Sequence, residues 1–247
     1  LPEVMVSTIS AVSGHGEISY GNAIGSVICN AALIAAITVA VRPGKVDPKT
    51  LRVPVAFFFA AAAIYCVAAY GMGRFTRPMG LLMLGMFVAY MAANVWQMKN
   101  APAEPEHEEE PMGIGKIVLL LVVGAALIAL GANLLVDNGT IIAQAMGVPE
   151  SVIALTFVAL GTSLPELVTA ITSLMKGHSD LSLGNVVGAN VFNLVLVSGM
   201  SVTLAPFEIP QSATLFGINS SLVLELPVML LVMVLLTIPA LGRGKVS

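Results

Sequence analysis

Long apolar runs separated by short polar segments fill almost the whole chain. A helix needs about 20 consecutive apolar residues to cross the hydrocarbon core of a bilayer. We expect one partial span followed by seven full ones, at 1–13, 20–41, 53–73, 78–98, 113–136, 150–175, 182–206 and 220–241. None of these runs alternates apolar and polar residues as the strands of an outer-membrane barrel do. The pattern therefore predicts an all-α, polytopic membrane protein with about eight spans.

Composition narrows the class of protein further. Of the 247 residues, 57% are hydrophobic and 10% are charged, whereas an ordinary soluble domain has about 25% charged residues. So few charges cannot cover the surface of a soluble enzyme, and we expect a membrane protein that is not an enzyme and carries no cofactor. The net charge of −3 argues against nucleic-acid binding, which needs a basic surface. The two cysteines, Cys29 and Cys66, stand inside apolar runs and are expected to be buried thiols.

Lysine and arginine are unevenly divided between the loops. The loops around 42–52, 99–116 and 176–180, with the last residues of the chain, hold nine of the eleven basic residues, and Arg74 and Arg77 lie on the other side. Because cytoplasmic loops are enriched in Lys and Arg, we place the side with nine in the cytoplasm and the protein in the cytoplasmic membrane. The Glu-rich stretch 100–112 is expected to be an acidic cytoplasmic linker between membrane halves at 1–99 and 113–247.

Part of the first half is repeated in the second. Residues 1–30 align with residues 164–193 at a constant offset of 163 without a gap, and 11 of the 30 pairs are identical. The identities include Leu-Pro-Glu, Gly-His and Gly-Asn-x-x-Gly, whereas chance similarity between apolar helices would preserve Leu and Val instead. We assign a truncated first repeat to 1–41 and a second repeat to 150–206.

Five spans separate the two copies, so the copies are expected to cross the membrane in opposite senses. Inverted-topology repeats are typical of secondary transporters, in which the substrate binds near the midplane where the repeats meet. This arrangement favours a transporter over a channel or a structural membrane protein.

The second copy carries a carboxylate in the middle of a span. An ionised Glu166 costs about 2.5 kcal/mol or more there unless something compensates it, which makes it a candidate functional residue. Pro165 has no N–H, so the carbonyl of Gly161 loses its helical partner. Thr162 and Ser163 add hydroxyl oxygens on the same turn. One short segment therefore presents carboxylate, hydroxyl and carbonyl oxygens together.

The first copy offers Glu3 behind Pro2, and each copy has a mid-span asparagine, Asn30 or Asn193. All of these candidate ligands are oxygen atoms, which predicts a hard cation rather than zinc or copper. Ca²⁺ takes six to eight oxygens at about 2.3–2.6 Å, and two glutamates would balance its charge.

Two other acidic residues are expected to have no part in this site. Glu17 stands just ahead of a helix and is expected to be a first-turn charge or a cap. Glu225 lies near the start of the last span, two residues before Pro227, and is expected to reach the membrane interface.

These motifs resemble the two alpha repeats of the cation/calcium antiporter superfamily, the sodium/calcium exchangers and their prokaryotic relatives. The matching stretches are Gly-Thr-Ser-Leu-Pro-Glu at 161–166 with Gly-Asn-Val-Val-Gly-Ala-Asn at 184–190, and Leu-Pro-Glu at 1–3 with Gly-Asn-Ala-Ile-Gly-Ser at 21–26. The resemblance implies a fold of ten helices with the repeats in helices two–three and seven–eight. On that fold the chain is expected to lack the first helix, the first half of the second, and the tenth.

The resemblance also implies the roles of individual residues. It makes Glu3 and Glu166 the central ligands shared by Ca²⁺ and the counter-ion. It assigns supporting roles to Thr162, Ser163, Ser26, Asn30 and Asn193, and it makes the backbone carbonyl of Ala159 a Na⁺ ligand. It further implies alternating access, in which the first and sixth helices slide across the core. The chain departs from the family pattern at Asn193, where some relatives have Asp, and at Ala189, where many have Ser.

We therefore expect an electrogenic antiporter that uses inward Na⁺ movement to expel Ca²⁺ across the bilayer. One Ca²⁺ or several Na⁺ can occupy the two carboxylates, and competition between the two sets of ions couples their fluxes. An antiporter with H⁺ as the counter-ion would fit as well, because carboxylates in a low dielectric titrate near neutral pH. A passive cation channel, or a membrane scaffold that transports nothing, is less favoured by the repeat.

Overall fold

The computed structural model describes residues 2–41, 44–45, 48–100, 113–148, 150–175, 180–211, 213–243 and 245–246. The acidic linker predicted at 100–112 lies outside these residues apart from Asn100, as does Leu1. The described part is mostly helical, as the long apolar runs predict. Two antiparallel pairs of two-residue strands join loops: β1 (Gly44–Lys45) with β4 (Lys245–Val246), and β2 (Thr214–Leu215) with β3 (Ile218–Asn219).

The first half contains four helical segments. Helix α1 is Pro2–Val12, and α2 (Gly16–Ile28) continues through the π-helical turn Cys29–Ile34 into α3 (Ala35–Val41). Helix α4 (Pro48–Cys66) ends in the π-helical turn Val67–Met72, and α5 is Arg77–Asn100. Gly73 follows that turn with a positive φ of 66°, a conformation that glycine adopts without strain, and it ends the helix.

The second half begins with the 32-residue helix α6 (Ile114–Ala145). It continues with α7 (Glu150–Ile153), the π-helical turn Ala154–Val158, α8 (Ala159–Thr162) and α9 (Leu164–Met175). Helix α10 (Asp180–Phe192) passes through the π-helical turn Asn193–Val197 into α11 (Ser198–Leu204). The turn Ser221–Glu225 leads into the last helix, α12 (Leu226–Arg243).

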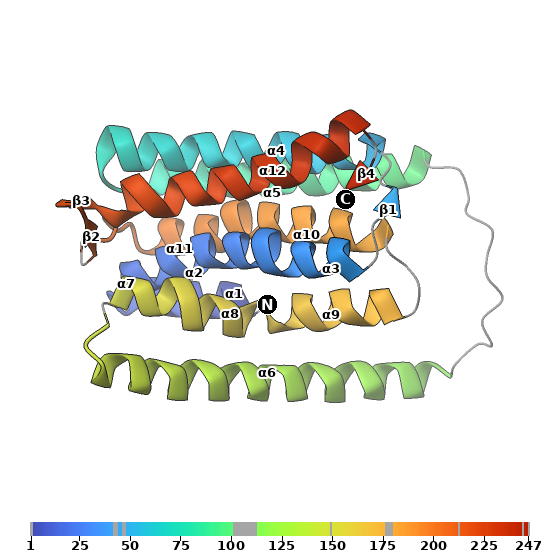
Figure 1. Ribbon diagram of the computed structural model, residues 1–247, viewed down its shortest axis with the longest axis horizontal. Coiled ribbons are helices and arrows are strands. Elements are labelled where there is room, and N and C mark those ends of the chain that lie inside the picture. The colour runs from blue at the N-terminus through green and yellow to red at the C-terminus, as the bar shows by residue number, and fades with distance from the viewer. Residues whose placement is uncertain are drawn as a thin grey trace.

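The helices lie side by side with their axes roughly parallel (Figure 1). Helices α2–α3 and α10–α11 occupy the middle, between a layer of α4, α5 and α12 and a layer of α1 and α7–α9, and α6 lies beyond the latter. The span Leu183–Leu204 is the most deeply buried of the apolar helices, in keeping with this central position. The two helices that carry the repeated Gly-Asn-x-x-Gly motif therefore form the core.

Five helices are long and apolar enough to cross a membrane within the described ranges: Gly16–Val41, Pro48–Met72, Arg77–Gln97, Leu183–Leu204 and Ser221–Gly242. The bent pair Ala154–Thr162 and Leu164–Ser173 makes a sixth if it counts as one span. Two shorter apolar helices, Pro2–Val12 and Ile114–Gly124, stand where the remaining predicted spans were placed. At about 1.5 Å per residue, the 11 residues of α1 are too short to cross a bilayer, so eight spans are not established.

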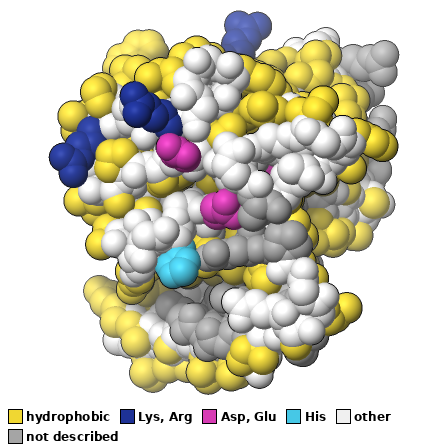
Figure 2. Space-filling view, turned by 90° about the vertical axis from the view of Figure 1, so that its left-hand side faces the viewer, with side chains coloured by type: hydrophobic (Ala, Val, Ile, Leu, Met, Phe, Trp, Pro, Cys, Tyr) yellow, Lys and Arg dark blue, Asp and Glu magenta, His cyan; other side chains and the backbone are white. Residues whose placement is uncertain are grey.

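The surface fits a multi-pass membrane protein. Figure 2 looks onto the end of the molecule that carries the β2–β3 pair, which we call the hairpin end. Charged side chains and one histidine are visible on this end, while hydrophobic side chains cover much of the flanks. Large apolar side chains such as Leu82, Val88 and Leu235 are more than half exposed along the outer helices. In a bilayer, lipid tails would cover these flanks.

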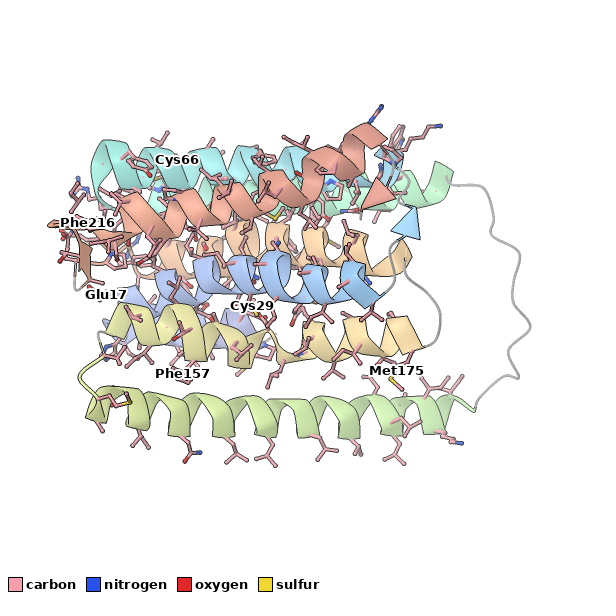
Figure 3. All side chains as sticks on the ribbon, in the orientation of Figure 1. Glu17, Cys29, Cys66, Phe157, Met175 and Phe216 are labelled. Atoms are coloured by element: carbon pink, nitrogen blue, oxygen red, sulfur yellow. The ribbon has the colours of Figure 1, made fainter. Side chains whose placement is uncertain are left out.

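Both cysteines are free thiols, but they are half-buried rather than fully buried as the sequence predicted. They lie on different helices, Cys29 at the start of a π-helical turn and Cys66 at the end of α4 (Figure 3). Only Cys29 lies near the middle of the helix bundle along its long axis.

Candidate functional site

The helix break predicted before Glu166 is present. Helix α8 ends at Thr162, α9 begins at Leu164, and the axes on the two sides of the break differ by 49°. Ser163 at the break has φ −87° and ψ 2°, outside the helical region. Because Pro165 has no N–H, the regular helical hydrogen-bond ladder cannot pass through this turn. The break therefore turns a set of polar atoms toward the neighbouring helices.

The two central glutamates come from opposite halves of the chain and lie close enough to interact electrostatically. Glu3 is in the first turn of α1 and is 4% exposed, and Glu166 is in the first turn of α9 and is partly buried. A carboxylate in the first turn of a helix is stabilised by the helix dipole. Among the residues that the structure describes, no three His, Cys, Asp or Glu side chains gather into a metal cluster. A cation held here would need neutral oxygens besides the two carboxylates.

Hydrogen bonds join three helices next to Glu3. The hydroxyl of Thr162 donates to Oδ1 of Asn22 at 2.8 Å and lies 3.3 Å from the hydroxyl of Ser26. Nδ2 of Asn22 donates to Oγ of Ser7 at 2.8 Å and lies 3.4 Å from the carbonyl of Glu3. All five of these residues are less than 5% exposed. The network fixes Thr162 and Ser26, two of the predicted ligands, against each other.

Asn22 belongs to this network although its sequence context did not predict a place in the site. Its position in the Gly-Asn-x-x-Gly motif was the available signal, but the motif alone gives no reason to choose it over its counterpart in the second copy. That counterpart, Asn185, is exposed and lines a cavity instead. The structure therefore assigns different surroundings to two residues that the repeat makes equivalent.

The predicted asparagine ligands both lie in π-helical turns, which occur frequently at functional sites. Nδ2 of Asn30 donates to Oδ1 of Asn190 at 3.1 Å, and Nδ2 of Asn190 lies 3.1 Å from the sulfur of Met233. This chain of contacts orients the Asn30 amide and leaves its Oδ1 for another partner. Asn193 is 4% exposed, and its backbone carbonyl accepts a hydrogen bond from Ser198 at 3.0 Å.

Several buried oxygens near the break have no hydrogen-bond partner among the described residues. They are Oγ of Ser163, Oε2 of Glu166 and Oδ1 of Asn30. Ser163 and Glu166 both lie near Cys29, and buried polar atoms are normally paired, so the unpaired oxygens of these two residues fit a site for a bound cation. The carbonyl of Ala159, the Na⁺ ligand that the resemblance implies, instead accepts a hydrogen bond from the Ser163 N–H at 3.0 Å.

A cavity of about 250 Å³ opens beside Glu166, between α9 and α10. Its polar lining comes from Glu166, Thr169, Ser173 and Asn185. Ala189, where many members of the superfamily are expected to carry serine, also lines it. The missing hydroxyl would therefore have faced the space next to the carboxylate. Cys29 lies near Glu166 and Ser163 as well, a position that its apolar sequence surroundings did not reveal.

The residues of this site fall in regions that match a known protein family. The model of the family described as "Sodium/calcium exchanger protein" matches residues 1–96 and 116–247. The chain belongs to the sodium/calcium exchanger family. The match covers both halves and includes all eight predicted ligands.

Relatives of this exchanger-family protein include bacterial and archaeal proteins. It is 34% identical to the "putative antiporter CaxA" of Alkalimonas amylolytica, over 86% of this chain and 68% of the relative. It is 31% identical to the "inner membrane protein YrbG" of Escherichia coli, over 99% of this chain and 77% of the relative. The "sodium/calcium exchanger MaX1" of Methanosarcina acetivorans is 26% identical, over 87% of this chain and 73% of the relative.

Solved structures of the sodium-calcium exchanger NCX_Mj share the fold. The structure of that protein soaked with Na⁺ and Sr²⁺ superimposes with a TM-score of 0.75 at 28% sequence identity. The superposition covers 100% of this chain and 76% of NCX_Mj. The family match and the shared fold together identify a membrane antiporter of the cation/calcium type.

Replacing Thr162 by valine is expected to lower the free energy of unfolding by about 1–3 kcal/mol, because the isosteric side chain leaves the buried Oδ1 of Asn22 without its donor. Thermal unfolding in detergent, with Ca²⁺ and Na⁺ removed, measures this loss as a lower Tm. Thr162→Ser keeps the hydroxyl and should unfold within a few degrees of wild type. Equal Tm values for the valine and serine variants would contradict the hydrogen-bond network.

Proposed function

We propose that the protein exchanges Na⁺ for Ca²⁺ across the cytoplasmic membrane through a site centred on Glu3 and Glu166. Supporting oxygens come from the neutral residues predicted from the sequence, namely Ser26, Asn30, Ala159, Thr162, Ser163 and Asn193. The observation that carries the proposal is the pairing of a buried and a partly buried carboxylate from the two halves, next to buried oxygens that have no partner among the described residues.

The chemistry of the site favours a hard cation. Its ligands are carboxylate, hydroxyl, amide and carbonyl oxygens, the set that Ca²⁺ and Na⁺ prefer over softer metals. Two carboxylates that repel each other in a low dielectric are costly to leave without a cation. One Ca²⁺ neutralises both charges, and Na⁺ ions do so only in larger number. The site without a cation is therefore the costly state to move across the membrane, and this cost obliges Na⁺ and Ca²⁺ to exchange.

Two inverted repeats would give this site its access to both sides of the membrane. In support, Glu3 and Glu166 both lie in the first turn of a helix, and Asn30 and Asn193 both lie in a π-helical turn. The names of MaX1 and NCX_Mj describe sodium/calcium exchange in relatives with the same fold or family. We extend that activity, and the placement of the basic loops in the cytoplasm, to this chain.

Uptake into liposomes tests the proposal directly. The purified protein is reconstituted into Na⁺-loaded liposomes, and ⁴⁵Ca²⁺ uptake is followed after dilution into Na⁺-free buffer. We expect uptake that requires internal Na⁺ and that carries net charge, so that a potential negative inside opposes the coupled Na⁺ efflux. Uptake that an outward H⁺ gradient drives equally well in the absence of Na⁺ would show that the counter-ion is H⁺ rather than Na⁺. Uptake indifferent to every internal ion would indicate a channel.

A further inference from the structure

Glu225 is a second buried acidic residue that the proposed exchange site does not use. The sequence placed it at the membrane interface, but the structure shows it 3% exposed, at the end of the π-helical turn Ser221–Glu225. Oε1 accepts a hydrogen bond from the hydroxyl of Ser220 at 2.7 Å, and Oε2 accepts one from the hydroxyl of Ser221 at 3.0 Å. Both carboxylate oxygens are therefore held by hydroxyl groups, at the hairpin end of the molecule.

The charge of Glu225 has no basic partner among the described residues. The groups that interact with this carboxylate are the two serines, Glu17 and Tyr20. Glu17 has the same sign and adds repulsion, and its Oε1 accepts the backbone N–H of Gln211 at 3.1 Å. The start of the helix contributes only a partial positive charge. A buried carboxylate without a cationic partner is expensive, so the cluster lacks a positive charge.

Tyr20 completes the cluster from the other side. This side chain of α2 is 1% exposed, lies beside Glu225 and Ser221, and its hydroxyl makes no hydrogen bond that meets normal geometry among the described residues. The rings of Tyr65 and Phe75, with centroids 6.2 and 6.1 Å away, hold the Tyr20 ring in place. A buried, unsatisfied phenol next to an uncompensated carboxylate indicates a missing ligand between them.

We propose that Glu225, Ser220, Ser221 and Tyr20 form a second cation site, which binds Na⁺ and is separate from the exchange site. The serine hydroxyls point their hydrogens at Glu225, so their oxygens stay available to a cation, as does the Tyr20 oxygen. One carboxylate neutralises one Na⁺, whereas Ca²⁺ would remain charged and would need six to eight oxygens. Hard oxygen ligands also disfavour soft metals.

A line of hydroxyls leads from this second site toward the exchange site. Tyr20 packs against Tyr65, and the hydroxyl of Tyr65 shares a hydrogen bond with Ser198. Ser198 in turn donates to the carbonyl of Asn193 at 3.0 Å. Glu17 lies at the same end of the molecule (Figure 3). The second site is thus placed between the hairpin end and a residue proposed to bind the exchanged ions.

Direct Na⁺ binding tests this site without relying on transport. Scintillation-proximity binding of ²²Na⁺ is measured on the purified protein in the Glu166→Gln background, in which the exchange site is disabled. We expect saturable Na⁺ binding that excess Ca²⁺ does not displace. Adding Glu225→Gln removes the single negative charge and should weaken that component at least about tenfold. Ser220→Ala with Ser221→Ala should weaken it while leaving the carboxylate in place.

Glu208→Gln is the matched control, because Glu208 is an exposed carboxylate whose backbone pairs with Arg74 near the same end. It should leave the Ca²⁺-resistant component unchanged. Absence of that component in the Glu166→Gln protein, or its persistence after Glu225→Gln, would overturn the second site. None of these results depends on whether Glu166 supports exchange, which the uptake assay decides separately.

Discussion

Replacing Glu166 by glutamine is expected to reduce Na⁺-driven Ca²⁺ uptake at least about 100-fold, to the background of empty liposomes. The site would then hold one carboxylate, Glu3, which cannot neutralise a divalent cation, and each unit of lost charge is worth several kcal/mol at short range in a low effective dielectric. Glutamine has almost the same volume as glutamate, and Glu166 borders a cavity rather than tightly packed side chains. Loss of transport should therefore occur without loss of the fold.

Two comparisons make this result specific. The Glu166→Gln protein should elute as wild type does in size-exclusion chromatography and should lose the rise in Tm that Ca²⁺ gives to the wild-type protein, since a ligand stabilises only the state that binds it. Glu208→Gln removes an exposed carboxylate instead and should transport as wild type does. Gradient-driven Ca²⁺ uptake that survives Glu166→Gln would remove this residue from the exchange site.

Replacing Gly25 by alanine is expected to damage both the fold and transport. A Cβ at this position would lie 2.3 Å from the carbonyl oxygen of Leu155 and 2.6 Å from Cβ of Ala159. The obstacle is backbone and a short side chain, so the helices themselves would have to separate. We expect a loss of about 1–3 kcal/mol or more in the free energy of unfolding. Separation would also move Ser26 away from Thr162 and impair exchange.

The repeat supplies the control for this experiment. Gly188 occupies the position equivalent to Gly25 at the offset of 163, but its added Cβ would meet only the hydroxyl of Tyr90, at 3.3 Å. Around Gly184, no described atom outside its own stretch of helix lies within 4 Å of an added Cβ. Thermal unfolding and ⁴⁵Ca²⁺ uptake of the three alanine variants should rank Gly25→Ala far below the other two. Equal damage at Gly25 and Gly188 would show that the repeats pack alike.

Two structural features of the proposed exchange site were predictable because they depend on local sequence. Pro165 predicts the break in the helix, and the break places Glu166 in the first turn of α9. The polar identities between the two copies point to Glu3 in the same way, and the structure brings the two carboxylates within electrostatic reach. The family was equally accessible, because the repeat motifs that suggested it are covered by the family match.

Other features depend on contacts between distant parts of the chain. Burial of Glu225 requires Tyr20 from a helix in the other half, whereas the place of Glu225 near the start of the last span suggested the membrane interface. The role of Asn22 depends on Thr162, also from the opposite half. The count of eight spans stays a prediction, because five helices of the described residues are long and apolar enough to cross a membrane, or six if the bent pair is one span.

Under the proposed exchange mechanism, the unequal surroundings of Asn22 and Asn185 would set an energy difference between the two orientations of the carrier. In the present one, Asn22 is bonded to Thr162 and Ser7, and Asn185 faces a cavity. If the two repeats exchanged roles in that mechanism, Asn185 would enter the buried environment, but the residue equivalent to Ser7 is Ala170 and offers no hydroxyl. We therefore expect the loss of this one hydrogen bond, worth about 1 kcal/mol, to bias the resting population about fivefold toward the present orientation.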